Sequence, residues 1–389
     1  MKKKLFFSFA LALTLVLTAW TTSTLASPSR NNVSIAESSG AVSSEDTTIE
    51  LVALDEHIPF ECAPLSPLGA ISTKQALIID GTISYLYCTF DEPNIACELL
   101  RSEIPELLQF LKNEYSLPEF SYGTWSEYWG KSINMHEVPS NSADINQQAV
   151  VFNCFADIMC NATRNEEIIQ YISARGPRDL SKLATMLPYT SDLPEDLEIR
   201  ITPESRATAQ IFNKSKGNSY AIRYAENPNI DGYGLTYTNI LGIEVADCTN
   251  FVSQILESGD IKQHDYFPDA EKGWWHAKME SLHWYSNTWQ RAHEFSGFMG
   301  RSDITQSLYT FSRNIAKDYF IALDFTGTGS FDHMGYIVQV GTYNTYNGKY
   351  YRDFKIAQHT SNYLDWVSKD INHWDDYDNV GKYCIVRKQ

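Results

Sequence analysis

The sequence predicts an α+β protein in which a mainly helical N-terminal part precedes a part built from one helix on a small antiparallel sheet. Apolar residues in the first half recur at spacings of three and four, as they do on one face of a helix. The last third alternates as strands, and Asn347-Gly348 separates two of them as a hairpin turn does. Between these regions, the segment Cys248–Glu257 has a single apolar helical face.

The first 26 residues predict export. Three lysines precede a mostly apolar run, Leu5–Leu17, and small residues then lead to a plausible signal-peptidase site after Ala26. That run is too short for a stable membrane anchor, and no later segment is apolar for long enough to span a bilayer. We therefore expect 1–26 to be a removed signal peptide and 27–50 to be a flexible leader. The mature protein is expected to be secreted or at the cell surface, without stable membrane insertion.

The charge of the chain argues against two classes of partner. Its formal net charge is −17, and removal of the signal would take away three lysines and no acidic residue. Such a protein repels the phosphates of nucleic acid and the headgroups of an anionic membrane surface. We therefore expect neither nucleic acid nor a charged lipid surface as its partner.

The N-terminal domain is expected to span 51–205, and its sequence contains no chemical constellation that indicates a role. One helix is predicted over Ile95–Tyr115 and a second over Ala149–Cys160, with Asn165 as the N-cap of a third. The segment Ala76–Tyr87 contains Asp80-Gly81 between apolar runs, which fits either a hairpin turn or a helix break.

Seven cysteines in an exported chain leave at least one thiol unpaired or paired between molecules. Five of them precede residue 161, and none has the spacing that a zinc site prefers. We expect some disulfides within the N-terminal part, of undetermined connectivity, and no bridge to Cys248. The cysteines are Cys62, Cys88, Cys97, Cys154, Cys160, Cys248 and Cys384.

The C-terminal domain is expected to span 206–389, after a loop at Thr202–Ser205. Its helix at Cys248–Glu257 ends at Ser258-Gly259. Its predicted strands are Tyr319–Phe325, Gly335–Val340, Tyr350–Gln358 and Tyr383–Val386.

Cys248 has the setting of a reactive cysteine. It stands at the first turn of its predicted helix, where unpaired backbone N–H groups and the helix dipole favour a thiolate. The same N–H groups could stabilise an oxyanion when the sulfur attacks a carbonyl. A buried cysteine that acts as a small apolar residue, or a bridge to Cys384, is the alternative interpretation of the same position.

Two histidines could act with Cys248. His333 stands at the start of a predicted strand, and a strand-borne imidazole facing a helix-borne thiol is a rigid Cys–His pair. His359 ends the neighbouring strand across the Asn347-Gly348 hairpin, where it could orient the first imidazole.

These segments together resemble the putative amidase domain family, which is similar to the papain-like cell-wall peptidases of the NlpC type. The resemblance covers about residues 208–389 and implies a papain-like fold with Cys248 as nucleophile, His333 as general base and acid, and His359 as the orienting residue. The chain departs from the family at Lys317, where a glycine is usual, and at Met334, where a serine is usual. The motifs that carry the resemblance are DCTNFVSQ at 247–254, Trp274-Trp275, Ser286 with Trp289, Asp332-His333, and His359-Thr360 with Tyr363.

Other polar and aromatic residues could form a substrate-binding site or belong to the hydrophobic core. Asp247, Trp274, Trp275 and Asp332 are our candidate substrate-binding residues, although core packing is the commoner role for a single tryptophan. The remaining histidines include His276 and His283, seven residues apart on a predicted helix, and none has a metal-binding spacing. We therefore expect neither a metal nor a cofactor.

The predicted function is an exported cysteine amidase or peptidase. The resemblance and the exported location point to peptidoglycan stem peptides, or another extracellular amide, as substrate. Acyl transfer to another acceptor would use the same residues. The alternative is a non-catalytic module that binds wall peptides or a protein, with Cys248 idle.

Overall fold

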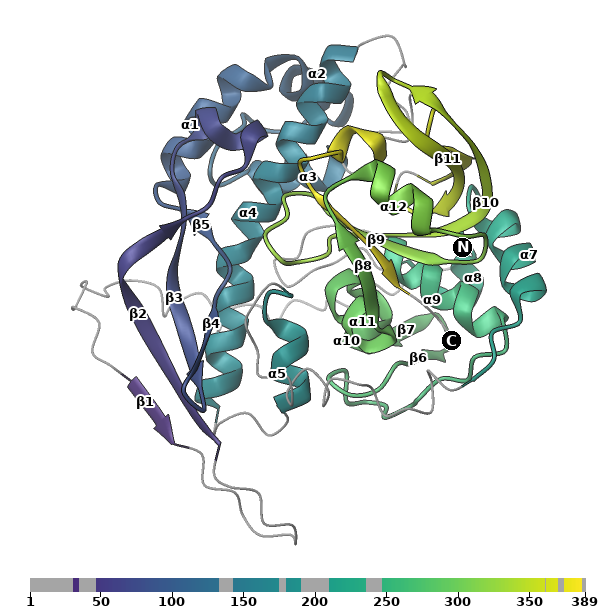
Figure 1. Cartoon of the computed structure of the whole chain (residues 1–389), viewed down its shortest axis with the longest axis horizontal. Helices are drawn as coiled ribbons and strands as arrows, with labels where there is room; N and C mark the ends of the chain where they lie inside the picture. Colours follow the sequence, from purple (N-terminus) through teal and green to yellow (C-terminus); the bar gives the residue numbers. More distant parts are fainter. Residues whose placement is uncertain are drawn as a thin grey trace, which may run out of the picture.

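A computed structural model describes most of the chain and places helices around two larger sheets (Figure 1). The predicted signal peptide and the loop at Thr202–Ser205 lie outside the described residues. Within the described residues, no helix is both long and apolar enough to cross a membrane. The described residues are 31–34, 47–132, 143–174, 180–189, 210–235, 247–360, 362–369 and 374–386.

The N-terminal part contains a five-stranded antiparallel sheet that the sequence analysis did not predict. The first strand, Asn31–Ser34, lies inside the expected leader and pairs with the second. The hairpin alternative for Asp80-Gly81 is confirmed, since both residues adopt the positive φ of a tight hairpin turn. The strands are β1 (Asn31–Ser34), β2 (Thr48–Pro59), β3 (Ile71–Ile79), β4 (Thr82–Tyr85) and β5 (Thr89–Phe90), and a short 3-10 helix η1 (Ala63–Leu68) follows β2.

The N-terminal helices differ from the predicted ones at two places. The helix predicted over Ile95–Tyr115 is two helices, because Pro105 lacks the N–H that would continue the first. Asn165 does not cap a helix, because α4 runs through it and its side chain bonds both the N–H and the carbonyl of Tyr87. The helices are α1 (Pro93–Glu103), α2 (Pro105–Tyr115), α3 (Trp125–Ser132), α4 (Ala143–Ser173) and α5 (Leu180–Met186).

The C-terminal part is a six-stranded sheet with helices on both faces, which confirms the α+β prediction. All its strand pairs are antiparallel, in the order β12-β11-β10-β9-β13-β8. Its helices are α7 (Lys214–Tyr224), α8 (Ile230–Tyr233), α9 (Cys248–Ser258), α10 (Asn287–Gln290), α11 (Ala292–Met299), α12 (Leu308–Asn314) and the 3-10 helix η3 (Trp374–Tyr377). Its strands are β6 (His276–Met279), β7 (Leu282–Tyr285), β8 (Arg301–Thr305), β9 (Phe320–Asp324), β10 (His333–Tyr346), β11 (Lys349–Gln358), β12 (Tyr363–Trp366) and β13 (Lys382–Val386), with β6 and β7 as a separate hairpin.

The two faces of this sheet belong to different hydrophobic cores. Met334 and Tyr336 of β10 pack with α9 in one core. Ile337 packs on the opposite face, in a core that also contains Phe155 of α4 and Phe311 of α12. Because side chains alternate along a strand, the start of β10 sends successive residues into different cores. This alternation determines which histidine can approach Cys248.

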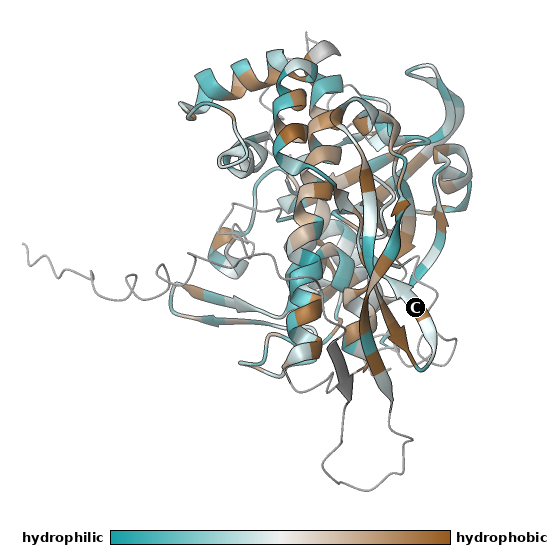
Figure 2. Ribbon diagram, turned by 90° about the vertical axis from the view of Figure 1, so that its left-hand side faces the viewer, coloured by the Kyte–Doolittle hydropathy of each residue, from teal (hydrophilic) through white to brown (hydrophobic). Residues whose placement is uncertain are grey.

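The two predicted domains share a core. α4 lies between the N-terminal sheet and the C-terminal sheet (Figure 1), and Figure 2 shows hydrophobic residues recurring along this long helix. Phe152 and Phe155 of α4 pack in the same cluster as Phe354 of β11. The division near residue 205 stays a prediction, but the two parts are joined by common packing.

The expected N-terminal disulfides are not formed. All seven cysteines are free and buried. The five that precede residue 161 lie in one apolar cluster, where they act as small core residues. Cys248 is unbridged, as expected.

Candidate active site

Cys248 is the first residue of α9, as predicted, and packs against the sheet with only 1% of its surface exposed. Apolar residues of the same helix, including Phe251 and Val252, hold it there. The Thr249 hydroxyl lies 3.6 Å from its sulfur, and the backbone of Met334 also hydrogen-bonds the sulfur. The sulfur therefore sits among polar groups of a helix start and a strand start.

The thiol of Cys248 is nevertheless the favoured form. Burial raises its pKa to about 11, while hydrogen bonds from Thr249 and from the Met334 backbone act in the opposite direction. The position at a helix start by itself favours the thiolate. In this arrangement the loss of solvation outweighs the helix terminus, because the sulfur is fully enclosed.

Alkylation of native protein by iodoacetamide should report this raised pKa. Because the thiolate is the reactive species, labelling of Cys248 is expected to be slow at pH 7 and to accelerate as the pH approaches 11. Cys384, whose pKa is raised to about 12, should follow at higher pH and serves as the internal comparison. Mass mapping of the labelled peptides measures both rates. Rapid labelling of Cys248 at pH 6 would contradict the buried environment.

The ring of His333 lies among residues of the core on the sheet face opposite to α9, and its role as the partner of Cys248 remains a prediction. It pairs with Leu323 of β9, and its ring lies 5.6 Å from that of Trp374. Burial lowers its pKa to about 4, and Gln358 is its hydrogen-bond partner. Its Nε2 has no partner among the described residues. Met334, one residue later, occupies the position that faces α9.

His359 is the histidine that shares a face with Cys248. Its Nδ1 lies 2.6 Å from the Asp247 carboxylate and its Nε2 lies 2.8 Å from the Tyr224 carbonyl. Both partners are acceptors, so a ring that bonds both donates from both nitrogens. The Phe251 ring stacks on the His359 ring, with 3.8 Å between the ring centres. The next residue, Thr360, takes a positive φ, so the chain turns directly after His359.

Asp247 positions this imidazole. It precedes Cys248 at the start of α9, and both of its oxygens are engaged, one by His359 and one by the Asn250 amide at 2.7 Å. Asn250 in turn accepts a hydrogen bond from the Trp289 indole at 2.8 Å. Asp247 was predicted to bind substrate, and that role stays a prediction. Only the meeting of a strand end and a helix start reveals its bond to His359.

The tryptophans predicted to bind substrate are core residues in this structure. Trp274 is buried, donates to the Ser253 hydroxyl at 3.0 Å and stacks on Trp289 at 4.8 Å. Trp275 is buried as well and donates to the Lys272 carbonyl at 3.0 Å. Trp274 thereby supports α9, and Trp275 packs on the Phe267 ring. Both are buried, as is common for a single tryptophan.

Asp332 belongs to a buried group of three carboxylates. Asp157, Asp324 and Asp332 each have an oxygen within 4.8 Å of the others, and they are the set of described residues that could hold a metal ion. Arg164 bridges Asp157 and Asp332 at 2.5 Å and 2.8 Å, and Thr326 donates to Asp157. Burial and the neighbouring charge of Asp157 raise the pKa of Asp332, and they raise that of Asp324 to about 6. Arg164 supplies the positive charge here, so Asp332 has a structural partner in place of a substrate.

The His276 and His283 side chains meet across the β6–β7 hairpin, and the helix predicted for them is not formed. Their rings stack at 5.1 Å, with Nε2 of His276 2.8 Å from Nδ1 of His283. Each nitrogen of this contact is occupied by the other ring. Burial lowers the pKa of His276 to about 4.

Comparison with known proteins gives one match. Residues 211–383 match the family model described as a putative amidase domain. No curated protein and no solved structure matched the chain. The matched segment contains α9 and the sheet strands up to the second residue of β13.

Proposed function

Since residues 211–383 belong to the putative amidase domain family, we propose that the protein hydrolyses amide bonds with Cys248 as its nucleophile. One observation carries the proposal: Asp247, which directly precedes Cys248, and Phe251, one turn further along α9, both contact the ring of His359. A helix-start cysteine and an oriented imidazole thus lie at one end of the same sheet face.

In the proposed reaction, the Cys248 thiol gives its proton to a base and its sulfur bonds to the amide carbonyl carbon. Backbone N–H groups at the start of α9 stabilise the oxyanion. The C–N bond then breaks, the amine leaves with a proton, and water hydrolyses the thioester to regenerate the thiol. His359, held by Asp247, replaces His333 as the proposed acid and base. To act as the base, its Nε2 has to leave the Tyr224 carbonyl and give up to water the proton that it donates there.

We further propose peptidoglycan stem peptides as the substrate class and the cell exterior as the location. The charged and apolar N-terminal segment of the sequence supports export. Peptide amides of the wall are then the abundant amides within reach. Detection of the mature N-terminus at residue 27 in secreted protein would test the location separately from the chemistry.

Replacement of Cys248 tests the chemistry. Cys248→Ala is expected to lower the rate of amide hydrolysis by about a thousandfold or more, because no other group forms the thioester. Cys384→Ala is the matched control, since Cys384 is an equally buried free thiol in the same core. Release of amines from stem peptides, measured with the full chain, compares the two variants.

The rival proposal is a binding module, and the enclosed thiol with its raised pKa is the observation that favours it. In that case wild-type protein would bind stem peptides without releasing amines, and Cys248→Ala would bind them equally well. Hydrolysis that survives in Cys248→Ala would exclude Cys248 as nucleophile.

A further inference from the structure

Three exposed tyrosines of the C-terminal part form a group on the surface. Tyr309, Tyr343 and Tyr350 are 40%, 43% and 57% exposed. They are half of the tyrosines among the exposed large hydrophobic residues of the described chain. Scattered exposed aromatic residues are ordinary, whereas a gathered group on a monomer surface usually serves binding.

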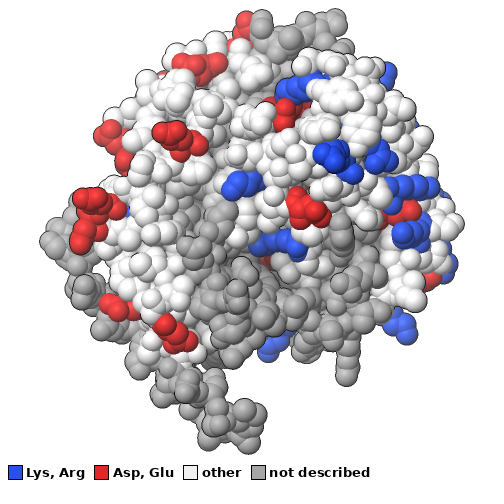
Figure 3. Space-filling model, in the orientation of Figure 1, with Lys and Arg blue, Asp and Glu red and all other residues white. Residues whose placement is uncertain are grey.

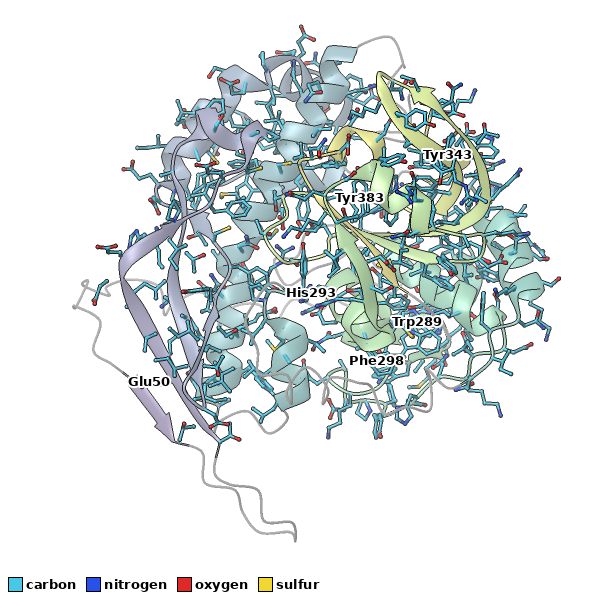
Figure 4. The ribbon with its side chains drawn as sticks, viewed as in Figure 1. Glu50, Trp289, His293, Phe298, Tyr343 and Tyr383 are labelled. Carbon is cyan, nitrogen blue, oxygen red and sulfur yellow. The ribbon has the colours of Figure 1, made fainter. Side chains whose placement is uncertain are left out.

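The three rings touch one another. The ring centres of Tyr309 and Tyr350 are 5.8 Å apart, those of Tyr343 and Tyr350 are 6.3 Å apart, and those of Tyr309 and Tyr343 are 6.4 Å apart. The Tyr343 and Tyr350 rings are within 26° of parallel. Figure 4 shows Tyr343 on the β10–β11 hairpin, well away from Trp289 beside α9.

Regular structure holds these rings in place. Tyr343 pairs with Arg352, and Thr345 pairs with Tyr350, so both tyrosines lie on one face of the hairpin. Tyr309 comes from α12, which packs against β11. A platform built from a helix and two paired strands is ordered before any ligand arrives, which reduces the entropy lost on binding.

Polar groups border the rings. The Arg313 guanidinium lies 5.5 Å from the centre of the Tyr309 ring, one helical turn along α12. Thr345 lies on the same face of the hairpin as Tyr343 and is exposed as well. The group therefore alternates flat apolar rings with hydrogen-bonding side chains, unlike a continuous apolar patch for a protein or lipid partner.

The charge of the molecule further restricts the class of ligand that could bind here. Figure 3 shows Asp and Glu side chains over the N-terminal elements and a mixture of Lys, Arg, Asp and Glu side chains over the C-terminal ones. The whole chain carries −17, so long-range attraction of a polyanion is unfavourable. An uncharged ligand is not repelled by this net charge.

We propose that Tyr309, Tyr343 and Tyr350 form a binding platform for an uncharged polysaccharide strand. A sugar ring has a flat face of C–H groups, which packs on a tyrosine ring, and a rim of hydroxyl groups, which bonds Arg313 and Thr345. Three adjacent rings offer contacts to successive sugars of one strand. The tyrosine hydroxyls add further donors and acceptors.

This platform is separate from the proposed active site. α12 packs on the face of the sheet opposite to α9 and Cys248. Binding of a polysaccharide there would hold the protein on its substrate-bearing material without touching the reacting residues. It does not depend on whether the protein hydrolyses amides.

Calorimetric titration of the full chain with hexamers of glucose and of N-acetylglucosamine tests the platform. Wild type is expected to bind at least one hexamer, and Tyr343→Ala/Tyr350→Ala to bind it about tenfold more weakly or worse. Tyr122→Ala removes a tyrosine that is 49% exposed on the N-terminal part and should bind as wild type does. Unchanged thermal unfolding of all three proteins separates a lost contact from a lost fold.

Three outcomes would overturn the proposal. They are no binding of either hexamer by wild type, equal binding by the double variant, and binding of double-stranded DNA as tight as that of the hexamers. The last would identify a surface driven by charge.

Discussion

The His359→Ala variant is expected to lose amide hydrolysis and about 3–5 kcal/mol of the free energy of unfolding. The ring is fully buried, and its removal leaves the Asp247 carboxylate inside the protein without its ion-pair partner. It also removes the ring that stacks on Phe251. Urea unfolding gives the stability, and hydrolysis rates are corrected for the folded fraction.

His333→Leu is the control for this prediction. His333 is also buried, but it lies on the other sheet face and its Nε2 has no partner among the described residues. An apolar side chain of similar size should therefore preserve hydrolysis. Should His333→Leu abolish hydrolysis while His359→Ala retains it, the assignment of the acid–base role to His359 would be wrong. Asp247→Asn, which keeps the shape of the site, gives a second test if His359→Ala does not fold.

The Arg164→Met variant is expected to lose about 3 kcal/mol of the free energy of unfolding at neutral pH. Arg164 bonds Asp157 and Asp332, whose side chains are only 1% and 8% exposed. Its own side chain is 25% exposed, so solvent screens part of the loss and the lower end of the usual range applies. Without the guanidinium, buried carboxylates face one another uncompensated.

The pH dependence of this loss has a definite sign. The pKa values of Asp324 and Asp332 are raised by burial and by Asp157, so these groups favour folding in their protonated form. A raised carboxyl pKa contributes stability at low pH and loses it as the pH rises through the folded value, about 6 for Asp324. The loss in Arg164→Met should therefore be smaller at pH 5 than at pH 8. Arg164→Lys keeps the positive charge but lacks the forked guanidinium that bonds two carboxylates at once. We therefore expect an intermediate loss of the free energy of unfolding. A loss in Arg164→Met that does not change between pH 5 and pH 8 would contradict this account.

Local sequence signals predicted the elements well where a single residue type determines the local backbone conformation. Asn347-Gly348 forms the turn of the β10–β11 hairpin, and Cys248 begins its helix. The break at Pro105 was missed, although proline cannot donate the bond that would continue α1. The N-terminal sheet was missed because most residues of β2 are exposed or half-buried, so this strand lacks a clear apolar alternation.

The site was half predictable. Cys248 and His359 could be found from their places at a helix start and a strand end. The side of the sheet on which His333 lies depends on strand register, and a shift of one residue reverses it. Met334 in place of the family's usual serine was the residue to examine, since it now occupies the position facing α9. The bond from Asp247 to His359 joins residues 112 positions apart, which no local pattern contains.

The packing of α4 against the back of the sheet means that the family segment does not stand alone. A chain begun at residue 206 would lack Phe152, Phe155 and Ile158, which cover Phe354 and neighbouring residues of the sheet. The apolar side chains of that face would be exposed to water. They would then favour association with another apolar surface, most readily that of a second copy of the fragment. The N-terminal residues thus form part of the hydrophobic interior of the C-terminal domain. Any exchange of this segment between proteins would have to carry α4 with it.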